Sequence, residues 1–314
     1  MYYIGVDLGG TKIAAGLVTE EGKLISKKSI PTLRQRNYQE ILKDMANLCL
    51  EIIKDNNLSV KDIHSIGVGS PGLPDPENGI LVYNNNLNFK NVPIRAELQK
   101  YIDLPVYLEN DANCAALGEA VAGAAKEFKS SITVTLGTGI GGGIILDGKI
   151  YSGSFNAGGE IGHHVIVADG EQCTCGRKGC WEVYASATAL IREAKIAAIK
   201  HPESQINSLV NGDINRINAK TPFDAAQNGD KTAKEVIDNY FKYLGMGIVN
   251  MVNILQPEAV IIGGGISGQG DYLLNPLRKI LDDESYGLES AKTKLKIAQL
   301  GNDAGIIGAA MLGK

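Results

Sequence analysis

Four residues with metal-binding side chains stand close together in the middle of the chain: His163, Cys173, Cys175 and Cys180. Nine residues separate the histidine from the first cysteine, one separates the first two cysteines, and four separate the last two. Three thiolates and one imidazole satisfy the tetrahedral coordination that zinc prefers, and Gly176 and Gly179 let the backbone fold back between the ligands. The segment therefore predicts a zinc site.

A disulfide bond and independent packing in a hydrophobic core are two other uses of these cysteines. No charged and apolar leader precedes the first strand-like residues, Tyr2–Val6, so we expect a cytoplasmic protein, in which clustered cysteines are seldom oxidised. Core cysteines are also not usually surrounded by glycine, lysine and arginine. Zinc is the favoured interpretation.

Two glutamates bracket the zinc segment. Glu160 lies three residues before His163, and Glu182 lies two residues after Cys180. Because four protein ligands leave no open coordination position, we expect the zinc to be structural and to hold these two carboxylates in place. The spacing alone also allows His164, which follows His163 directly, to be the fourth ligand.

The composition is that of a globular protein with two lobes. The chain has 314 residues, of which 44% are hydrophobic and 21% charged, and its 38 glycines are well above average usage. A net charge of −4 argues against a nucleic-acid partner, which needs a basic face. No apolar run approaches the roughly 18 residues of a membrane span, so no membrane partner is expected.

Two segments share the same order of features and suggest an internal duplication at the scale of a domain. Val6–Val18 and Val134–Leu146 both contain a strand, a turn of glycine and small polar residues, and a second strand. Short apolar and glycine patterns also match by chance, so a coincidence stays open as the alternative.

Two phosphate-loop motifs fail in their sequence context. Gly137, Gly139 and Gly142 fit G-x-G-x-x-G, but that motif must open a helix, and here a strand follows. Residues 143–149 fit G-x-x-x-x-G-K, but Ile150 stands where the magnesium-binding Ser or Thr belongs. Neither a dinucleotide fingerprint nor a P-loop is supported.

Asp111 stands where a predicted strand, Val106–Leu108, meets a predicted helix, Ala112–Ala122. Asp is a common helix N-cap, which is one interpretation. The other is that a carboxylate held at such a junction has a fixed geometry and faces a cleft. The glycine- and proline-rich loop 69–74 also allows two interpretations: it is a plain turn, or its backbone lines a ligand-binding site.

Strands alternate with helices along the chain, which predicts an α/β fold with mixed sheets. The other expected strands are Tyr2–Leu8, Ile13–Val18, Ile63–Val68, Ala259–Ile262 and Leu295–Leu300, and the other expected helices are Tyr38–Lys54, Ala187–His201, Lys231–Leu255 and Ala304–Leu312. Pro202–Thr221 is polar and is expected at the surface. Gly245 and Gly247 weaken the longest helix, so we expect another element or a ligand to approach closely there.

Five motifs in this order resemble those of the ROK family of bacterial sugar kinases and sugar-responsive repressors, within the actin-like ATPase superfamily: Asp7–Lys12, Glu109–Asn113, Leu136–Gly143, Gly159–His163 and Cys173–Glu182. The resemblance extends from Asp7 to the last helix. It implies a two-lobed, ribonuclease H-like fold with duplicated mixed-sheet domains and a cleft between them. The expected lobes are residues 1–111 with about 301–314, and residues 112–300, which carry the zinc motif.

The resemblance also implies an ATP-dependent kinase that phosphorylates the 6-hydroxyl of glucose. Asp111 would be the general base that accepts the hydroxyl proton, and Asp7 would orient magnesium. The sugar would contact Gly72, Asn110, Asp111, Glu160, His163 and Glu182. The nucleotide would contact Gly9, Gly10, Thr11, Lys12, Thr138, Gly139, Gly264 and Gly265. The zinc ligands would be His163, rather than His164, and the three cysteines.

The residue types agree with these implied roles. Phosphoryl transfer needs positioning, a metal and charge stabilisation, and glycine turns expose backbone N–H groups that bind phosphates. Carboxylates accept hydrogen bonds from the vicinal hydroxyls of a sugar.

Two other functions stay open. The acceptor could be N-acetylmannosamine, N-acetylglucosamine, fructose or allose instead of glucose. The chain could also be a sugar-responsive repressor, but the first strand begins at Tyr2 and the net charge is negative, so we expect no helix-turn-helix and no DNA binding. The resemblance further implies a homodimer or a larger homo-oligomer.

Overall fold

The computed structural model describes residues 1–287 and 292–314, which form two compact units. The first contains Met1–Thr133, Gly143–Gly159 and Ala298–Lys314, and the second contains Val134–Gly142 and Glu160–Ile297. The lobes expected from the sequence, divided after residues 111 and 300, stay a prediction about the functional division; by packing, residues 112–133 belong to the first unit. Among the described helices, none combines the length and the apolar composition needed to cross a membrane.

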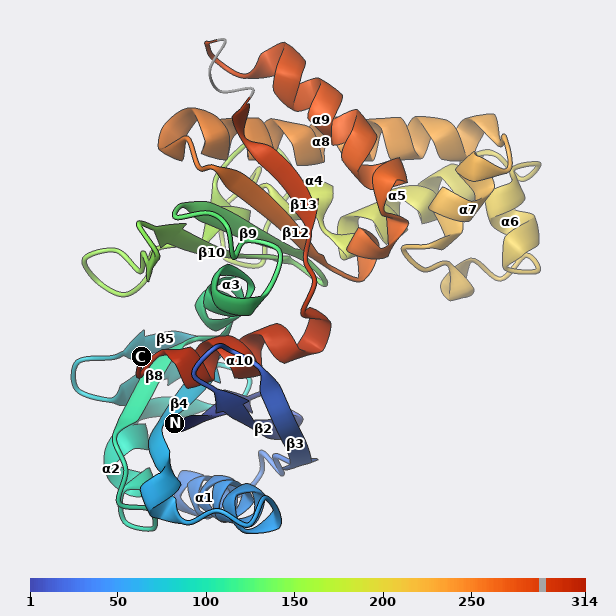
Figure 1. The fold of residues 1–314 in the computed structure, drawn as a ribbon. Coiled ribbons are helices and arrows are strands. Elements are labelled where there is room, and N and C mark those ends of the chain that lie inside the picture. The colour runs from blue at the N-terminus through green and yellow to red at the C-terminus, as the bar shows by residue number, and fades with distance from the viewer. Residues whose placement is uncertain (288–291) are drawn as a thin grey trace. The chain divides into compact units, whose positions relative to one another are not determined.

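A five-stranded sheet in the order β3-β2-β1-β4-β8 forms the centre of the first unit (Figure 1). β1 pairs antiparallel with β2 and parallel with β4, and β4 pairs parallel with β8. The strands are β1 (Tyr2–Leu8), β2 (Lys12–Thr19), β3 (Leu24–Pro31), β4 (Ile63–Ser70) and β8 (Val106–Asn110). The helices are α1 (Tyr38–Asp55), α2 (Ile94–Leu98), α3 (Asp111–Ala122) and α10 (Ala304–Met311), and a small antiparallel sheet contains β5 (Leu73–Asp75), β6 (Ile80–Asn84) and β7 (Phe89–Val92).

Alternate residues of β1 face two different layers, because successive side chains of a strand point to opposite sides. Ile4 and Val6 belong to a large core that includes the buried side of α1, whereas Tyr3 packs with α10. Gly5 is on the same side as Tyr3, and a Cβ there would lie 1.8 Å from the carbonyl oxygen of Ile306 in α10. The backbone of α10 therefore rests directly on the sheet.

A second five-stranded sheet has the order β11-β10-β9-β12-β13. Its strands are β9 (Ser131–Leu136), β10 (Ile140–Leu146), β11 (Lys149–Ile150), β12 (Ala259–Gly264) and β13 (Lys294–Ile297). Numbered in chain order within each sheet, both sheets have the strand order 3-2-1-4-5. The two similar segments, Val6–Val18 and Val134–Leu146, lie in the first two strands of their sheets, so the structure confirms the predicted duplication.

The helices of the second unit are α4 (Glu182–Ala185), α5 (Ala187–Lys200), α6 (Gln205–Leu209), α7 (Thr221–Gln227), α8 (Lys231–Leu255) and α9 (Asp271–Glu284). The approach expected at the glycines of α8 is confirmed, since a Cβ on Gly247 would lie 2.0 Å from the ring of Trp181. Most residues of Pro202–Thr221 are exposed, as expected, but the segment also contains α6, in which Ile206 is fully buried. The last strand ends at Ile297 rather than Leu300, and α9 was not expected.

The contact between α3 and α10 predicts a large effect of a single methyl group. A Cβ on Gly308 would lie 1.7 Å from the carbonyl oxygen of Cys114, and backbone cannot rotate away as a side chain can. We expect Gly308→Ala to lower the free energy of unfolding by about 3 kcal/mol, measured by urea denaturation. Gly305→Ala is the matched control in the same helix, because no atom lies within 4 Å of its Cβ position. It should be neutral or stabilising, by up to about 1 kcal/mol, and equal losses in both variants would contradict the packing account.

Candidate active site and metal site

In the first unit, Asn110 fixes the junction between β8 and α3. Its Oδ1 accepts hydrogen bonds from the N–H groups of Ala112 at 2.9 Å and Asn113 at 3.3 Å, and its Nδ2 donates to the carbonyl oxygen of Gly72 at 3.2 Å. Asn110 is therefore the N-cap of α3. The interpretation of Asp111 as the N-cap is wrong. Asp111 is instead the first residue of α3.

Two further features hold this junction in place. The buried carboxylate of Glu109 accepts hydrogen bonds from the N–H of Asn110 at 2.8 Å and from Nδ2 of Asn113 at 3.1 Å. Gly72 has a φ of +99°, and a Cβ there would lie 2.1 Å from the carbonyl oxygen of Tyr83. Only glycine fits at this position, so the acceptor for Asn110 is fixed by backbone alone.

Asp7, at the end of β1, is close enough to Asp111 for the two carboxylates to repel each other. The pKa of Asp7 is raised to about 6, first by burial and then by the charge of Asp111, while Lys12 acts in the opposite direction. Neighbouring like charges and burial both disfavour an ionised carboxylate. A divalent cation beside Asp7 would remove this repulsion, so the residues fit the magnesium expected there.

The turn between β1 and β2 is held by Thr32, which directly follows β3. The N–H of Gly9 donates to the carbonyl oxygen of Lys12 at 3.1 Å. Thr32 donates from Oγ1 to the carbonyl oxygen of Gly9 at 2.7 Å and from its N–H to that of Thr11 at 3.0 Å. A cavity of about 530 Å³ opens beside the turn and is lined by Asp7 and Lys12, among others. The residues that flank the turn, a carboxylate before it and a lysine after it, thus line one cavity.

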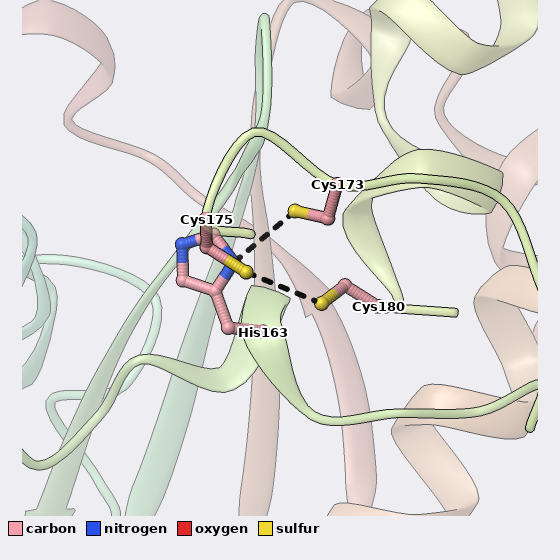
Figure 2. A group of neighbouring side chains, drawn as sticks. All are labelled: His163, Cys173, Cys175 and Cys180. Atoms are coloured by element: carbon pink, nitrogen blue, oxygen red, sulfur yellow. Dashed lines mark hydrogen bonds between the residues drawn. The ribbon is translucent and has the colours of Figure 1, made fainter. Parts of the chain in front are cut away.

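In the second unit, the four expected zinc ligands point toward one another (Figure 2). All of their ligand atoms lie within 4.8 Å of one another. Sγ of Cys175 is 3.6 Å from Sγ of Cys180, and Sγ of Cys173 is 3.7 Å from Nδ1 of His163. Two sulfurs that are each about 2.3 Å from a tetrahedral zinc ion lie about 3.8 Å apart, so the cluster has the dimensions of a zinc site.

The chemistry of the cluster also fits a cation. Burial raises the pKa of Cys173 to about 12, so this thiol needs a positive charge beside it to ionise. The pKa of Cys175 is lowered, chiefly by the backbone N–H of Arg177. His164 lies outside the cluster, with its ring centroid 5.3 Å from that of Trp181. The structure therefore groups His163, and not His164, with the cysteines.

Glu182 connects the cluster to the turn between β9 and β10. Its Oε1 lies 3.1 Å from Sγ of Cys173 and 3.6 Å from Nδ1 of His163. Its Oε2 accepts a hydrogen bond from the N–H of Ile140 at 3.4 Å, and a Cβ on Gly139 would lie 2.3 Å from the same oxygen. Any side chain at Gly139 would displace Glu182.

The remaining predicted residues of the second unit are glycines near the ends of β9 and β12, and Glu160. The N–H of Gly137 donates to the carbonyl oxygen of Gly139 at 3.1 Å, which makes a tight turn with Thr138 at its tip. Gly264 has a φ of +86°, and a Cβ there would meet the carbonyl oxygen of Leu136 at 2.2 Å; Gly265 follows it. Glu160 is exposed, and its carbonyl oxygen accepts a hydrogen bond from the N–H of His163 at 3.1 Å.

Sequence reasoning missed three residues that support the candidate site residues of the first unit: Glu109, Thr32 and Asn84. Asn84 is fully buried, donates to the carbonyl oxygen of Pro71 at 2.8 Å and accepts from the N–H of Leu87 at 3.0 Å. Asn84 begins a run of three asparagines, and nothing in this run distinguishes a buried amide from an exposed one.

Comparison with known proteins agrees with the motifs. The model of the ROK family matches residues 3–314. A glucokinase from Halalkalibacterium halodurans is 38% identical over 314 residues, which are 100% of this chain and 95% of that protein. A crystal structure of a ROK family glucokinase from Streptomyces griseus in complex with glucose and AMPPNP is 36% identical, with a TM-score of 0.80 and 99% of each chain covered. A xylose repressor from Caldicellulosiruptor bescii is 32% identical over 305 residues, 97% of this chain and 76% of that protein.

The chain therefore belongs to the ROK family. Its duplicated sheets are the actin-like ATPase fold of the family's sugar kinases, as the motifs led us to expect. The two glucokinases match over nearly their whole length, whereas about a quarter of the repressor has no counterpart in the aligned chain.

The raised pKa of Asp7 predicts how stability depends on pH. Because its pKa is higher in the folded than in the unfolded chain, its favourable contribution is complete below about pH 4 and is lost as the pH rises through about 6. Asp7→Asn avoids this loss and should be more stable than the wild type by about 2–3 kcal/mol at pH 8, in urea denaturation without magnesium. The difference should shrink toward zero at pH 4.

The control is Asp103→Asn, which changes an exposed carboxylate of the same unit and should show no such pH-dependent gain. A destabilised Asp7→Asn variant at pH 8 would contradict the raised pKa that burial and the charge of Asp111 together give Asp7.

Proposed function

We propose that this protein transfers the γ-phosphoryl group of ATP to the 6-hydroxyl of glucose. The observation that carries the proposal is the position of Asp111 at the start of α3, beside Asp7 and in the same unit as the glycine turn of β1 and β2. The similarity to bacterial glucokinases over the full chain supports it.

In this mechanism Asp111 is the general base. Its carboxylate accepts the proton of the 6-hydroxyl as the oxygen attacks the phosphoryl group, and α3 holds it in position through the cap at Asn110. Asp7 would hold magnesium, which neutralises charge on the phosphates when bound. The backbone of Gly9, Gly10 and Thr11 and the ammonium of Lys12 bind the phosphates, together with Thr138, Gly139, Gly264 and Gly265.

Sugar recognition is assigned to fixed hydrogen-bonding groups. Gly72, Asn110 and Asp111 in the first unit and Glu160, His163 and Glu182 in the second are proposed to contact the hydroxyls. A site of this kind discriminates by about 10⁴-fold or more against an analogue that lacks a hydroxyl, because its own polar groups are left unpaired.

The zinc is proposed to be structural, with His163, Cys173, Cys175 and Cys180 as its ligands. Four protein ligands leave no position for a water nucleophile, so the metal would hold the segment that carries Glu182. We further propose a cytoplasmic location, where a reducing environment keeps the thiols available for zinc, and a homodimer or larger homo-oligomer.

Two alternatives are tested by activity. Family membership alone allows a sugar-responsive regulator, since a xylose repressor also matches the chain. Among kinases, another hexose could be the acceptor. Purified protein with magnesium and ATP should be assayed on glucose, N-acetylmannosamine, N-acetylglucosamine, fructose and allose. Glucose should give the highest kcat/KM; another sugar in that place would reassign the substrate, and no turnover on any would refute the kinase.

Asp111→Asn tests the general base, because it keeps the size and the capping geometry but cannot accept a proton. We expect kcat to fall by at least about 10²-fold, with little change in the KM for ATP. Asp103→Asn, the exposed control in the same unit, should retain wild-type kcat. If Asp111→Asn kept most of the turnover, the assignment would be wrong.

Cys175→Ser tests the structural role of zinc. Loss of one thiolate should lower the Tm and weaken glucose binding more than nucleotide binding, measured by calorimetry. Thr174→Ala, at the exposed neighbouring position, should change neither. Equal losses of glucose and nucleotide affinity would mean that the metal supports the whole unit rather than the sugar contacts.

A further inference from the structure

The first unit contains a second cavity, of about 720 Å³, that the proposed reaction does not use. It lies where the loop between β3 and α1 meets the segment that leads into β7. Its charged lining residues are Arg34, Arg36 and Lys90, and no acidic residue is among the described residues that line it. In a chain with a net charge of −4, a concave surface with three cations and no acid is unusual.

The donors of this cavity are incompletely used within the part of the chain that the structure describes. Arg36 pairs with Asp44, but its Nε is buried and has no hydrogen-bond partner there. Arg34 and Lys90 are exposed and form no ion pair with any described residue. A buried donor without an acceptor destabilises a protein, so Arg36 in particular favours an acceptor from outside the chain.

The start of α1 adds two more donors to the same surface. The N-cap Asn37 accepts a hydrogen bond from the N–H of Glu40. Tyr38 and Gln39, which line the cavity, lie in the first turn, where backbone N–H groups have no acceptor within the helix. Together with the three cationic side chains, these amides complement an anion with several acceptor oxygens.

The floor of the cavity is apolar. Leu87 and Phe89 are buried, and the ring of Tyr38 meets that of Phe89 edge-on, with centroids 6.3 Å apart. An inorganic anion would contact only the cationic side chains, whereas the organic part of a phosphate ester would also contact these apolar residues. We propose that the cavity binds a small phosphate monoester, with the phosphate on Arg34, Arg36, Lys90 and the first turn of α1, and the organic part against Tyr38 and Phe89.

Two residues next to the cavity lining also contact the turn between β1 and β2, which is proposed to bind phosphates. Thr32, at the start of the β3–α1 loop, hydrogen-bonds to Gly9 and Thr11. Asn86, next to Leu87, lies 3.0 Å from the Cβ position of Gly10. A ligand in the cavity would therefore lie next to the residues that hold the turn between β1 and β2. The proposal does not depend on which sugar the enzyme phosphorylates.

Calorimetry on the intact zinc-loaded protein tests the proposal. Magnesium, AMPPNP and glucose are present at saturation, so that the proposed catalytic site is filled, and the titrants are inorganic phosphate and glucose 6-phosphate. Glucose 6-phosphate should bind, and Arg34→Ala/Lys90→Ala should weaken it by at least about tenfold. Binding of glucose 6-phosphate several-fold tighter than inorganic phosphate identifies the monoester as the ligand, whereas equal affinities would refute the part played by Tyr38 and Phe89.

The matched control removes two positive charges outside the cavity lining. Lys54→Ala/Lys61→Ala changes two exposed residues, Lys54 in the last turn of α1, about 24 Å along the helix from Tyr38, and Lys61 in the short helix η1 (Val60–Asp62) that follows, and this variant should bind the titrants as the wild type does. Retained kinase activity of Arg34→Ala/Lys90→Ala would show that this variant is folded. No binding of either titrant to the wild type, or the same loss of affinity in both double variants, would overturn the site.

Discussion

The capping of α3 by Asn110 is the interaction on which the account of the first unit depends. One side chain satisfies two backbone donors of the helix and at the same time joins the helix to the loop at Gly72. The carboxylate of Glu109 accepts a hydrogen bond from the N–H of Asn110. Helix α10 packs against α3 at glycines where the backbones are too close for any side chain. Asp111 is the first residue of this helix, so the same contacts hold its backbone in place.

Each unit also contains a group of side chains whose ionised forms are unfavourable without a cation beside them. In the first, burial and Asp111 raise the pKa of Asp7. In the second, Cys173 is buried beside the carboxylate of Glu182, among ligand atoms spaced for zinc. Without a cation both groups are unfavourable in the folded chain, which supports the metals proposed for the two units.

Local patterns in the sequence predicted much of this arrangement. The spacing of His163 and the three cysteines predicted the cluster, and the similarity of Val6–Val18 to Val134–Leu146 predicted that the first two strands of the two sheets are repeats of each other. The small sheet of β5 to β7 was not predicted, because strands of three to five residues carry weak local signals. Helix α9 was missed although Leu273, Leu277 and Leu281 recur at helical spacing, and Pro276 interrupts that pattern. The contact of Glu182 with Ile140 joins residues 42 apart, and only the fold reveals it.

The central claim is that this chain phosphorylates glucose rather than merely binding a sugar. The most direct test is ³¹P NMR of the purified protein with magnesium, ATP and glucose, and a parallel sample without glucose. The account predicts that ATP is converted to ADP with the appearance of one phosphate monoester, glucose 6-phosphate, only when glucose is present. Hydrolysis of ATP to inorganic phosphate at the same rate in both samples, or unchanged ATP with glucose bound, would contradict it.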